Sequence, residues 1–190
     1  MKSSYIFTLA LLLFTLGISC NSDDEEDDND NLPINNPGTI TAVVNGQRLN
    51  FLAFGTDAEL NQRRDGFVEF DFRIDGETDQ DGFEFDIDLN LFGVDFDLVG
   101  EGDVFAGDGE FGELVFSGNY GKISRTPGDN TDIQTATEIG MASDQCTFTK
   151  IDRVNRLVSG TFSFNAINIF DDSDVYEVRE GVFTDLEYRE

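Results

Sequence analysis

The stretch Val68-Glu-Phe-Asp-Phe-Arg-Ile-Asp75 alternates apolar with polar residues, and Phe83-Glu-Phe-Asp-Ile-Asp-Leu-Asn-Leu91 repeats the alternation. Successive side chains of a β-strand point to opposite faces, so a period of two is typical of strands with one buried face. Residues 76–82 between them are polar and have Gly at both ends, which is typical of a turn. The two stretches therefore predict an antiparallel hairpin whose phenylalanines face a core.

Similar alternation continues on both sides of this hairpin. Asn45-Gly46 is a two-residue hairpin signal between predicted strands at 40–44 and 49–54. Val94, Phe96 and Leu98 alternate with two aspartates in the same strand-like manner. Further strands are predicted at 146–151, 157–166, 175–178 and 182–188, with turns at 152–156 and 179–181.

A helical stripe is absent from the sequence after residue 38, and only residues 131–141 leave room for a short helix or an irregular loop. Residues 39–190 therefore predict one all-β domain, an antiparallel β-sandwich or barrel of about eight to ten short strands. The 19 phenylalanines of the whole chain indicate an aromatic-rich core, because so charged a chain needs concentrated apolar area to offset its conformational entropy.

The N-terminus has the features of a signal peptide. Lys2 supplies a positive charge, residues 5–16 form an apolar run, and Gly17-Ile18-Ser19-Cys20 follows. A helix needs about 20 apolar residues to span a bilayer, so this run predicts a cleaved leader, residues 1–19, in preference to a permanent span. Residues 20–38 then predict an extended linker, since the run from Asp23 to Asp30 repels itself and two prolines follow.

The residues before the cut resemble the signal of bacterial lipoproteins, although Gly17 stands where that family usually has Leu. The resemblance implies that Cys20 is acylated on its sulfur and on its new amino group. Several acyl chains give stable membrane anchoring, because each buried methylene contributes about 0.8 kcal/mol. Cys146 would then be a single thiol, which we expect to be buried in a strand.

Two further resemblances concern location and fold. The segment Ser22-Asp23-Asp24-Glu25-Glu26 resembles the signal that exports Bacteroidota lipoproteins to the cell surface, while its composition alone predicts a solvated spacer. Val158-Ser-Gly-Thr-Phe-Ser-Phe-Asn-Ala166 and Gly181-Val-Phe-Thr-Asp-Leu-Glu-Tyr188 resemble the closing strands of small Bacteroidota lipoproteins of unknown function. Together they imply a lipid-anchored all-β domain at the outer membrane, exposed at the cell surface, without an established activity.

The net charge and the absence of His disfavour several classes of function. The chain carries 39 acidic and 12 basic residues, a net charge of −27, and no His. Phosphates would be repelled, so we expect no nucleic acid among the partners. Absence of His removes the commonest general base and metal ligand at neutral pH, which disfavours a triad hydrolase or a zinc enzyme.

The acidic residues suggest one metal site. Glu77-Thr-Asp79-Gln-Asp81-Gly82 has oxygen ligands at alternate positions before a Gly, like the front of a calcium loop. Asp86 and Asp88 follow on the next predicted strand and complete the candidate calcium ligands with Asp79 and Asp81. The alternative is a polar hairpin turn. If the acidic strands are neighbours, like charges lie opposite one another and destabilise the sheet, and a cation or basic partner would relieve this.

The remaining motifs of the sequence give little indication of a catalytic site. Gly107-Asp-Gly-Glu-Phe-Gly112 has dinucleotide-site spacing, but a predicted strand follows it where such a site needs a helix. We therefore predict a membrane-anchored, non-catalytic binding or structural module with a protein or glycan partner and no cofactor besides possible calcium. Two alternatives remain, a calcium-dependent adhesion or glycan-binding module and a carboxylate-based glycoside hydrolase, which would need two carboxyls about 5 to 10 Å apart.

Overall fold

The structure is a computed structural model, and it describes residues 38–52, 57–62, 70–110, 112–126, 133–136 and 143–190. The predicted leader, Cys20 and the segment from Ser22 to Glu26 lie outside the described residues. The chain divides after residue 33, and every described residue belongs to the second unit, Ile34–Glu190.

The described residues confirm the all-β prediction. Their elements, in chain order, are β1 (Thr39–Val44), β2 (Gln47–Leu52), β3 (Asp57–Gln62), β4 (Phe70–Gln80), β5 (Phe83–Gly93), the 3-10 helix η1 (Phe96–Leu98), β6 (Val104–Ala106), β7 (Val115–Ser124), β8 (Ile133–Ala136), β9 (Gln145–Asp152), β10 (Leu157–Asn168) and β11 (Asp171–Glu187).

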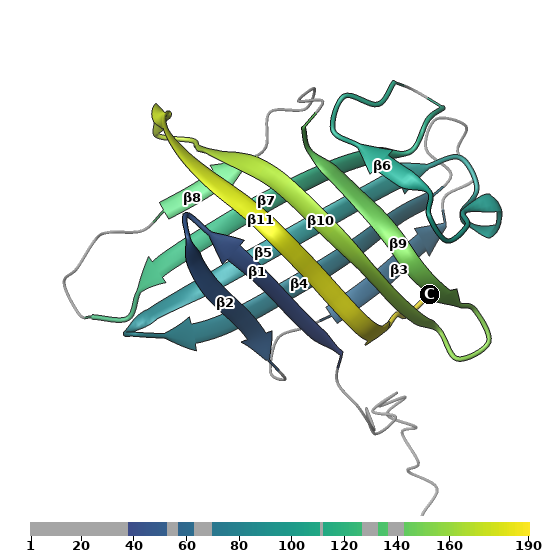
Figure 1. Ribbon diagram of the computed structural model, residues 1–190, viewed down its shortest axis with the longest axis horizontal. Helices are drawn as coiled ribbons and strands as arrows, with labels where there is room; N and C mark the ends of the chain where they lie inside the picture. The colour runs from purple at the N-terminus through teal and green to yellow at the C-terminus, as the bar shows by residue number, and fades with distance from the viewer. Residues whose placement is uncertain (1–37, 53–56, 63–69, 111, 127–132, 137–142) are drawn as a thin grey trace, which may run out of the picture. The chain divides into compact units, whose positions relative to one another are not determined.

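The strands form one sheet that folds over on itself. Its order is β2-β1-β11-β10-β9-β6-β7-β5-β4-β3, and neighbours are antiparallel except for β6 and β7. In Figure 1, β2, β1, β11, β10 and β9 form a front layer that crosses a back layer of β7, β5, β4 and β3. The short strand β8 lies off this path and pairs with both β10 and β7, so it joins the two layers.

The chain's own end joins the layers on the other side. Glu59 of β3 forms a parallel bridge with Arg189. The Leu60 N–H donates to the Arg189 carbonyl at 2.7 Å, and the Arg189 N–H donates to the Ala58 carbonyl at 2.9 Å. The fold therefore combines two packed layers, as in a sandwich, with cross-links between them, as in a barrel.

Phenylalanine rings fill the space between the layers, as the alternation predicted. Phe72 of β4 and Phe105 of β6 each meet Phe148 of β9 edge to face, with ring centroids 5.5 Å apart. Such pairs add about 0.5 to 1.5 kcal/mol each beyond the area they bury. The core is therefore aromatic in the way that the composition indicated.

In the closing hairpin, formed by β10 and β11, two glycines lie opposite phenylalanines and leave room for their rings. Gly160 of β10 is paired with Phe183 of β11, and Phe162 with Gly181. A Cβ atom at Gly181 would lie 2.4 Å from the Phe162 ring, and one at Gly160 would lie 2.3 Å from the Phe183 ring. Each Gly thus accommodates the ring of the other strand, which gives the two Gly-x-Phe segments of the sequence a common physical role.

Both predicted hairpins are present, but the second turn, which was predicted at 76–82, is shorter than the sequence suggested. β4 continues to Gln80, and only Asp81 and Gly82 turn, with φ of 54° and 83°. Both residues adopt positive φ, as in the two-residue turns that match the twist of paired strands. The polar residues 76–80 therefore belong to a strand, and each is paired with a residue of β5.

The turn predicted at 179–181 is wrong. β11 runs through this segment, and its pairing with both β1 and β10 shifts by one residue there. Glu180 has φ of 49° and precedes Gly181, so the extra residue is a β-bulge. A bulge and a turn use the same residues at positive φ, and only the neighbouring strands distinguish them.

Two other segments differ from the prediction. Phe96–Leu98 is the 3-10 helix η1 because the Asp95 carboxylate accepts a hydrogen bond from the Asp97 N–H at 3.0 Å and starts a turn. Phe96 is buried there, but Leu98 is 81% exposed. Within residues 131–141, the described part is neither helix nor loop but β8, which is held by pairing with β7 and β10.

Candidate functional site

The two layers present different chemistry on their outer faces. The front layer directs several hydroxyl and amide side chains outward, among them Thr41, Asn50, Thr161 and Ser163. The back layer directs carboxylates outward from β4 and β5. The front face therefore combines hydroxyl and amide groups with opposed charges, such as Lys150 paired with Asp185 at 2.7 Å, whereas carboxylates dominate the outer face of β4 and β5.

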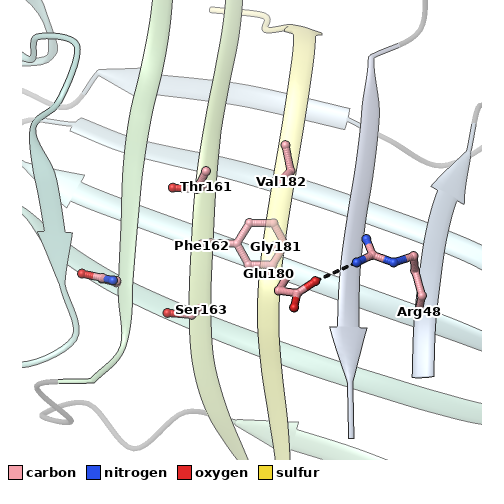
Figure 2. A pocket seen from close by; sticks show the side chains of 8 residues that line it. Arg48, Thr161, Phe162, Ser163, Glu180, Gly181 and Val182 are labelled. Carbon is pink, nitrogen blue, oxygen red and sulfur yellow. Dashed lines mark hydrogen bonds and ion pairs between the residues drawn. The ribbon is translucent and has the colours of Figure 1, made fainter. Parts of the chain in front are cut away.

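A hollow lies on this front face, and we call it the front hollow. Its volume is about 420 Å³, and it is open to solvent. Figure 2 shows its side chains coming from β9, β10, β11 and, beyond β1, β2. The lining residues are Arg48, Gln145, Thr161, Phe162, Ser163, Glu180, Gly181 and Val182.

The bulge in β11 shapes one side of the hollow. Glu180 adopts a positive φ, and Arg48 of β2 extends over β1 and donates a hydrogen bond to the Glu180 carboxylate at 2.7 Å (Figure 2). The side chains are 55% and 70% exposed, so the pair adds little to stability. Its effect on the hollow is electrostatic, because the two ionisable groups of the lining neutralise each other.

The remaining lining groups are hydrogen-bonding but uncharged. Thr161 and Ser163 supply hydroxyls, Gln145 supplies an amide, and Val182 adds an apolar surface that is 40% exposed. Hydroxyls and amides both donate and accept hydrogen bonds. The hollow is therefore suited to a neutral, polar ligand, with Val182 providing apolar contact.

The sequence did not reveal this site. Arg48 and Glu180 are 132 positions apart in the sequence, and Thr161 and Ser163 alternate with core residues as in any strand with one outward face. The one local signal was Arg179-Glu-Gly181, which we read as a turn. The structure shows that this signal marks a bulge beside the hollow.

The hairpin of β4 and β5 carries a ladder of carboxylates on the back face. Three opposed pairs make up this carboxylate ladder, namely Asp75 with Asp88, Glu77 with Asp86, and Asp79 with Glu84. Like charges directly opposite each other destabilise a sheet. The acidic strands β4 and β5 are therefore neighbours, whereas Asp97 lies in η1.

Arginines offset the two outer pairs of the ladder. Arg73 donates to Asp75 at 2.9 Å and lies 3.8 Å from Asp88. Arg125 contacts Asp79 at 3.4 Å and also pairs with Glu84. The protein's own cations therefore supply part of the counter-charge that we had assigned to a metal or a basic partner.

Two carboxyls of the ladder hold protons more strongly than usual. Burial, followed by a hydrogen bond with Asp75, raises the pKa of Asp88 to about 6. Burial and repulsion from Glu77 also raise the pKa of Asp86. Asp75 and Asp88 are thus in direct contact, which is closer than the spacing that glycoside hydrolysis requires.

The four predicted calcium ligands do not converge on one point of the sheet. Asp79 lies in β4 opposite Glu84, Asp81 lies in the turn, and Asp86 and Asp88 follow in β5. Within the ranges that the structure describes, no group of three or more His, Cys, Asp or Glu residues is arranged to hold a metal ion. The loop-like ligand arrangement is lost because residues 77–80 are extended.

A buried polar cluster that sequence reasoning missed lies at the start of β9. Asp144 is 1% exposed, and its Oδ1 accepts from the Asn165 N–H at 3.1 Å and the Ser143 hydroxyl at 3.2 Å. Arg179 donates to the Asn165 side chain at 2.6 Å. Burial raises the pKa of Asp144, against these hydrogen bonds. The cluster ties residues 143–144 to β10 and β11.

The two remaining features of the sequence are the Gly-rich segment 107–112 and Cys146. The Gly107 N–H donates to the Asp144 carbonyl, and the following element is β7, so the Gly-rich segment precedes a strand as predicted. Phe111 within it lies outside the described residues. Cys146 is fully buried in β9, as expected, and burial raises the pKa of its thiol.

The part of the chain with described coordinates contains no helix long and apolar enough to cross a membrane. No protein-family model, no curated protein and no solved structure matches the chain.

Proposed function

We propose that the protein is a lipid-anchored, surface-exposed binding module that takes a neutral polar ligand, such as a glycan segment, in the front hollow. The observation that carries the proposal is the hollow itself, a hydrogen-bonding site whose two charged groups, Arg48 and Glu180, balance each other, on a chain with a net charge of −27. Binding fits it better than acid-base catalysis, because Arg48 and Glu180 are its ionisable groups and they neutralise each other.

Attachment through Cys20 and export through the segment from Ser22 to Glu26 are part of the proposal. The supporting observation is the N-terminal sequence, namely an apolar leader, a cysteine and a run of acids. Radiolabelled palmitate should label the full chain, and Cys20→Ala should abolish the label. Protease added to intact cells should remove the domain; full protection in intact cells, with digestion after lysis, would contradict surface exposure.

Binding is tested with immobilised neutral and anionic oligosaccharides. We expect neutral ones to bind and anionic ones to be repelled by the acidic chain. Thr161→Tyr should fill the hollow and weaken binding about tenfold or more, a loss of about 1.4 kcal/mol. Thr184→Tyr is the matched control, since Thr184 is exposed on β11 outside the hollow. Equal binding by both variants would show that the hollow is not the site.

Thermal unfolding distinguishes this proposal from a calcium-dependent module. The arginines at the carboxylate ladder lead us to expect that calcium raises the midpoint no more than magnesium at matched ionic strength, by screening alone. A rise specific to calcium would mean that the native state binds the ion. That result would favour the adhesion alternative.

A further inference from the structure

The two edge strands of the sheet, β3 and β2, differ in their hydrogen-bond partners. At one end, β3 has backbone hydrogen bonds to Arg189, so the chain's own terminus occupies part of its edge. At the other end is β2, which pairs with β1 and with no other described strand. An exposed strand edge is a template for pairing with another strand unless it is blocked.

The pairing register shows which groups of β2 face outward from this edge. Val44 and Gln47 flank the two-residue turn and form a hydrogen-bonded pair, and such pairs alternate along an antiparallel ladder. Arg48, Asn50 and Leu52 consequently direct their N–H and C=O groups away from β1. These three residues supply a regular row of donors and acceptors.

β2 has few of the usual devices against edge pairing. The β1–β2 hairpin, residues 39–52, contains no Pro, Asp or Glu, in a chain with 39 acidic residues. Its one charged side chain, Arg48, is neutralised by Glu180. A strand from elsewhere in this acidic molecule would bring carboxylates to the edge, whereas β2 itself would bring none.

We propose that two copies of the chain associate through β2, pairing antiparallel about a two-fold axis at Asn50. The free groups are self-complementary in this register, since Asn50 meets Asn50 and Arg48 meets Leu52 of the second copy. The two Arg48 residues would lie about 14 Å apart along the strand, beyond the screening length at physiological salt. The dimer would join the two front layers into one continuous sheet.

Cross-linking tests the proposed axis on the full chain in the membranes of producing cells. Residues directly opposite each other have Cβ atoms about 4.5 to 5.5 Å apart, so Asn50→Cys should give a dimer with a short thiol cross-linker. Thr184→Cys, exposed on the same face but away from the axis, is the matched control. Buried Cys146 is common to both. Equal yields, or a product with a different protein, would overturn the proposal.

Sedimentation of the purified full chain in detergent provides an independent test. The wild type should shift from monomer towards dimer as its concentration rises. Asn50→Asp places two carboxylates opposite each other and should weaken dimerisation about two- to fivefold. Thr184→Asp adds the same charge away from the axis and should weaken it less. Asn50→Pro removes the outward N–H and should abolish it, with unfolding midpoints showing that the variants are folded. A monomeric wild type at every concentration would refute the inference.

Discussion

Two glycines of the closing hairpin allow the packing of the core to be tested in detail. An added Cβ at Gly181 would lie 2.4 Å from two ring atoms of Phe162, whereas an added Cβ at Gly160 would meet both the Phe183 ring, at 2.3 Å, and the Thr147 carbonyl, at 2.5 Å. The first obstacle is a side chain. The second includes backbone, which cannot move without disturbing β9.

The expected magnitudes follow from this difference. Overpacking a core costs about 1 to 3 kcal/mol, so Gly181→Ala and Gly160→Ala should each destabilise the protein by about 2 kcal/mol or more. Replacing Phe162 by Leu should remove most of the cost of Gly181→Ala, giving a coupling energy of about 1 to 2 kcal/mol. Replacing Phe183 by Leu should rescue Gly160→Ala much less, because the Thr147 carbonyl remains in place.

Urea unfolding of the full chain in detergent, followed by circular dichroism, measures the four variants and two double mutants. Each kcal/mol should shift the thermal midpoint by about 2 to 4 °C, which provides a second readout. If Phe183→Leu rescued Gly160→Ala as completely as Phe162→Leu rescues Gly181→Ala, the backbone would not be the obstacle at Gly160. If Gly181→Ala were neutral, the ring would not occupy this space.

Three further predictions each concern a single residue. The pKa of Asp88 is raised in the fold, so its contribution to stability should fall as pH rises from about 4 to about 6. The free energy of unfolding of Asp88→Asn, relative to wild type, should thus be about 1 kcal/mol higher at pH 7.5 than at pH 4 in urea titrations, a value that allows for the partial exposure of Asp88. A difference between the two proteins that does not change with pH would contradict this. The Cys146 thiol is buried with a raised pKa, so a thiol reagent should label it only after denaturation, and rapid native labelling would contradict its burial. Arg153 donates to the Phe96 and Val99 carbonyls at 2.8 and 2.6 Å, so Arg153→Lys should cost about 1 to 2 kcal/mol, and an unchanged urea midpoint would show that these bonds add nothing.

The parts of the fold that depend on local chemistry were predictable from the sequence. Alternation at period two identified the strands that carry Phe72 and Ile87, because a pleated backbone sends neighbouring side chains to opposite faces. Asn45-Gly46 identified a hairpin, because both residues adopt positive φ there. The sequence also predicted that the two acidic strands pair, but not the register of the carboxylate ladder, because Glu77 and Asp79 were expected in the turn.

The bulge, β8 and the front hollow were decided by tertiary structure. Arg48 and Glu180 are 132 positions apart, and they come within hydrogen-bond distance only because β1 pairs with both β2 and β11. Glu180 forms a bulge instead of a turn because β1 and β10 pair on both sides of it. The amino-acid sequence by itself determined which residues face the core, whereas strand neighbours depend on the packing of distant segments. The order of strands in the sheet likewise makes β2 an edge strand, and the sequence does not show this order.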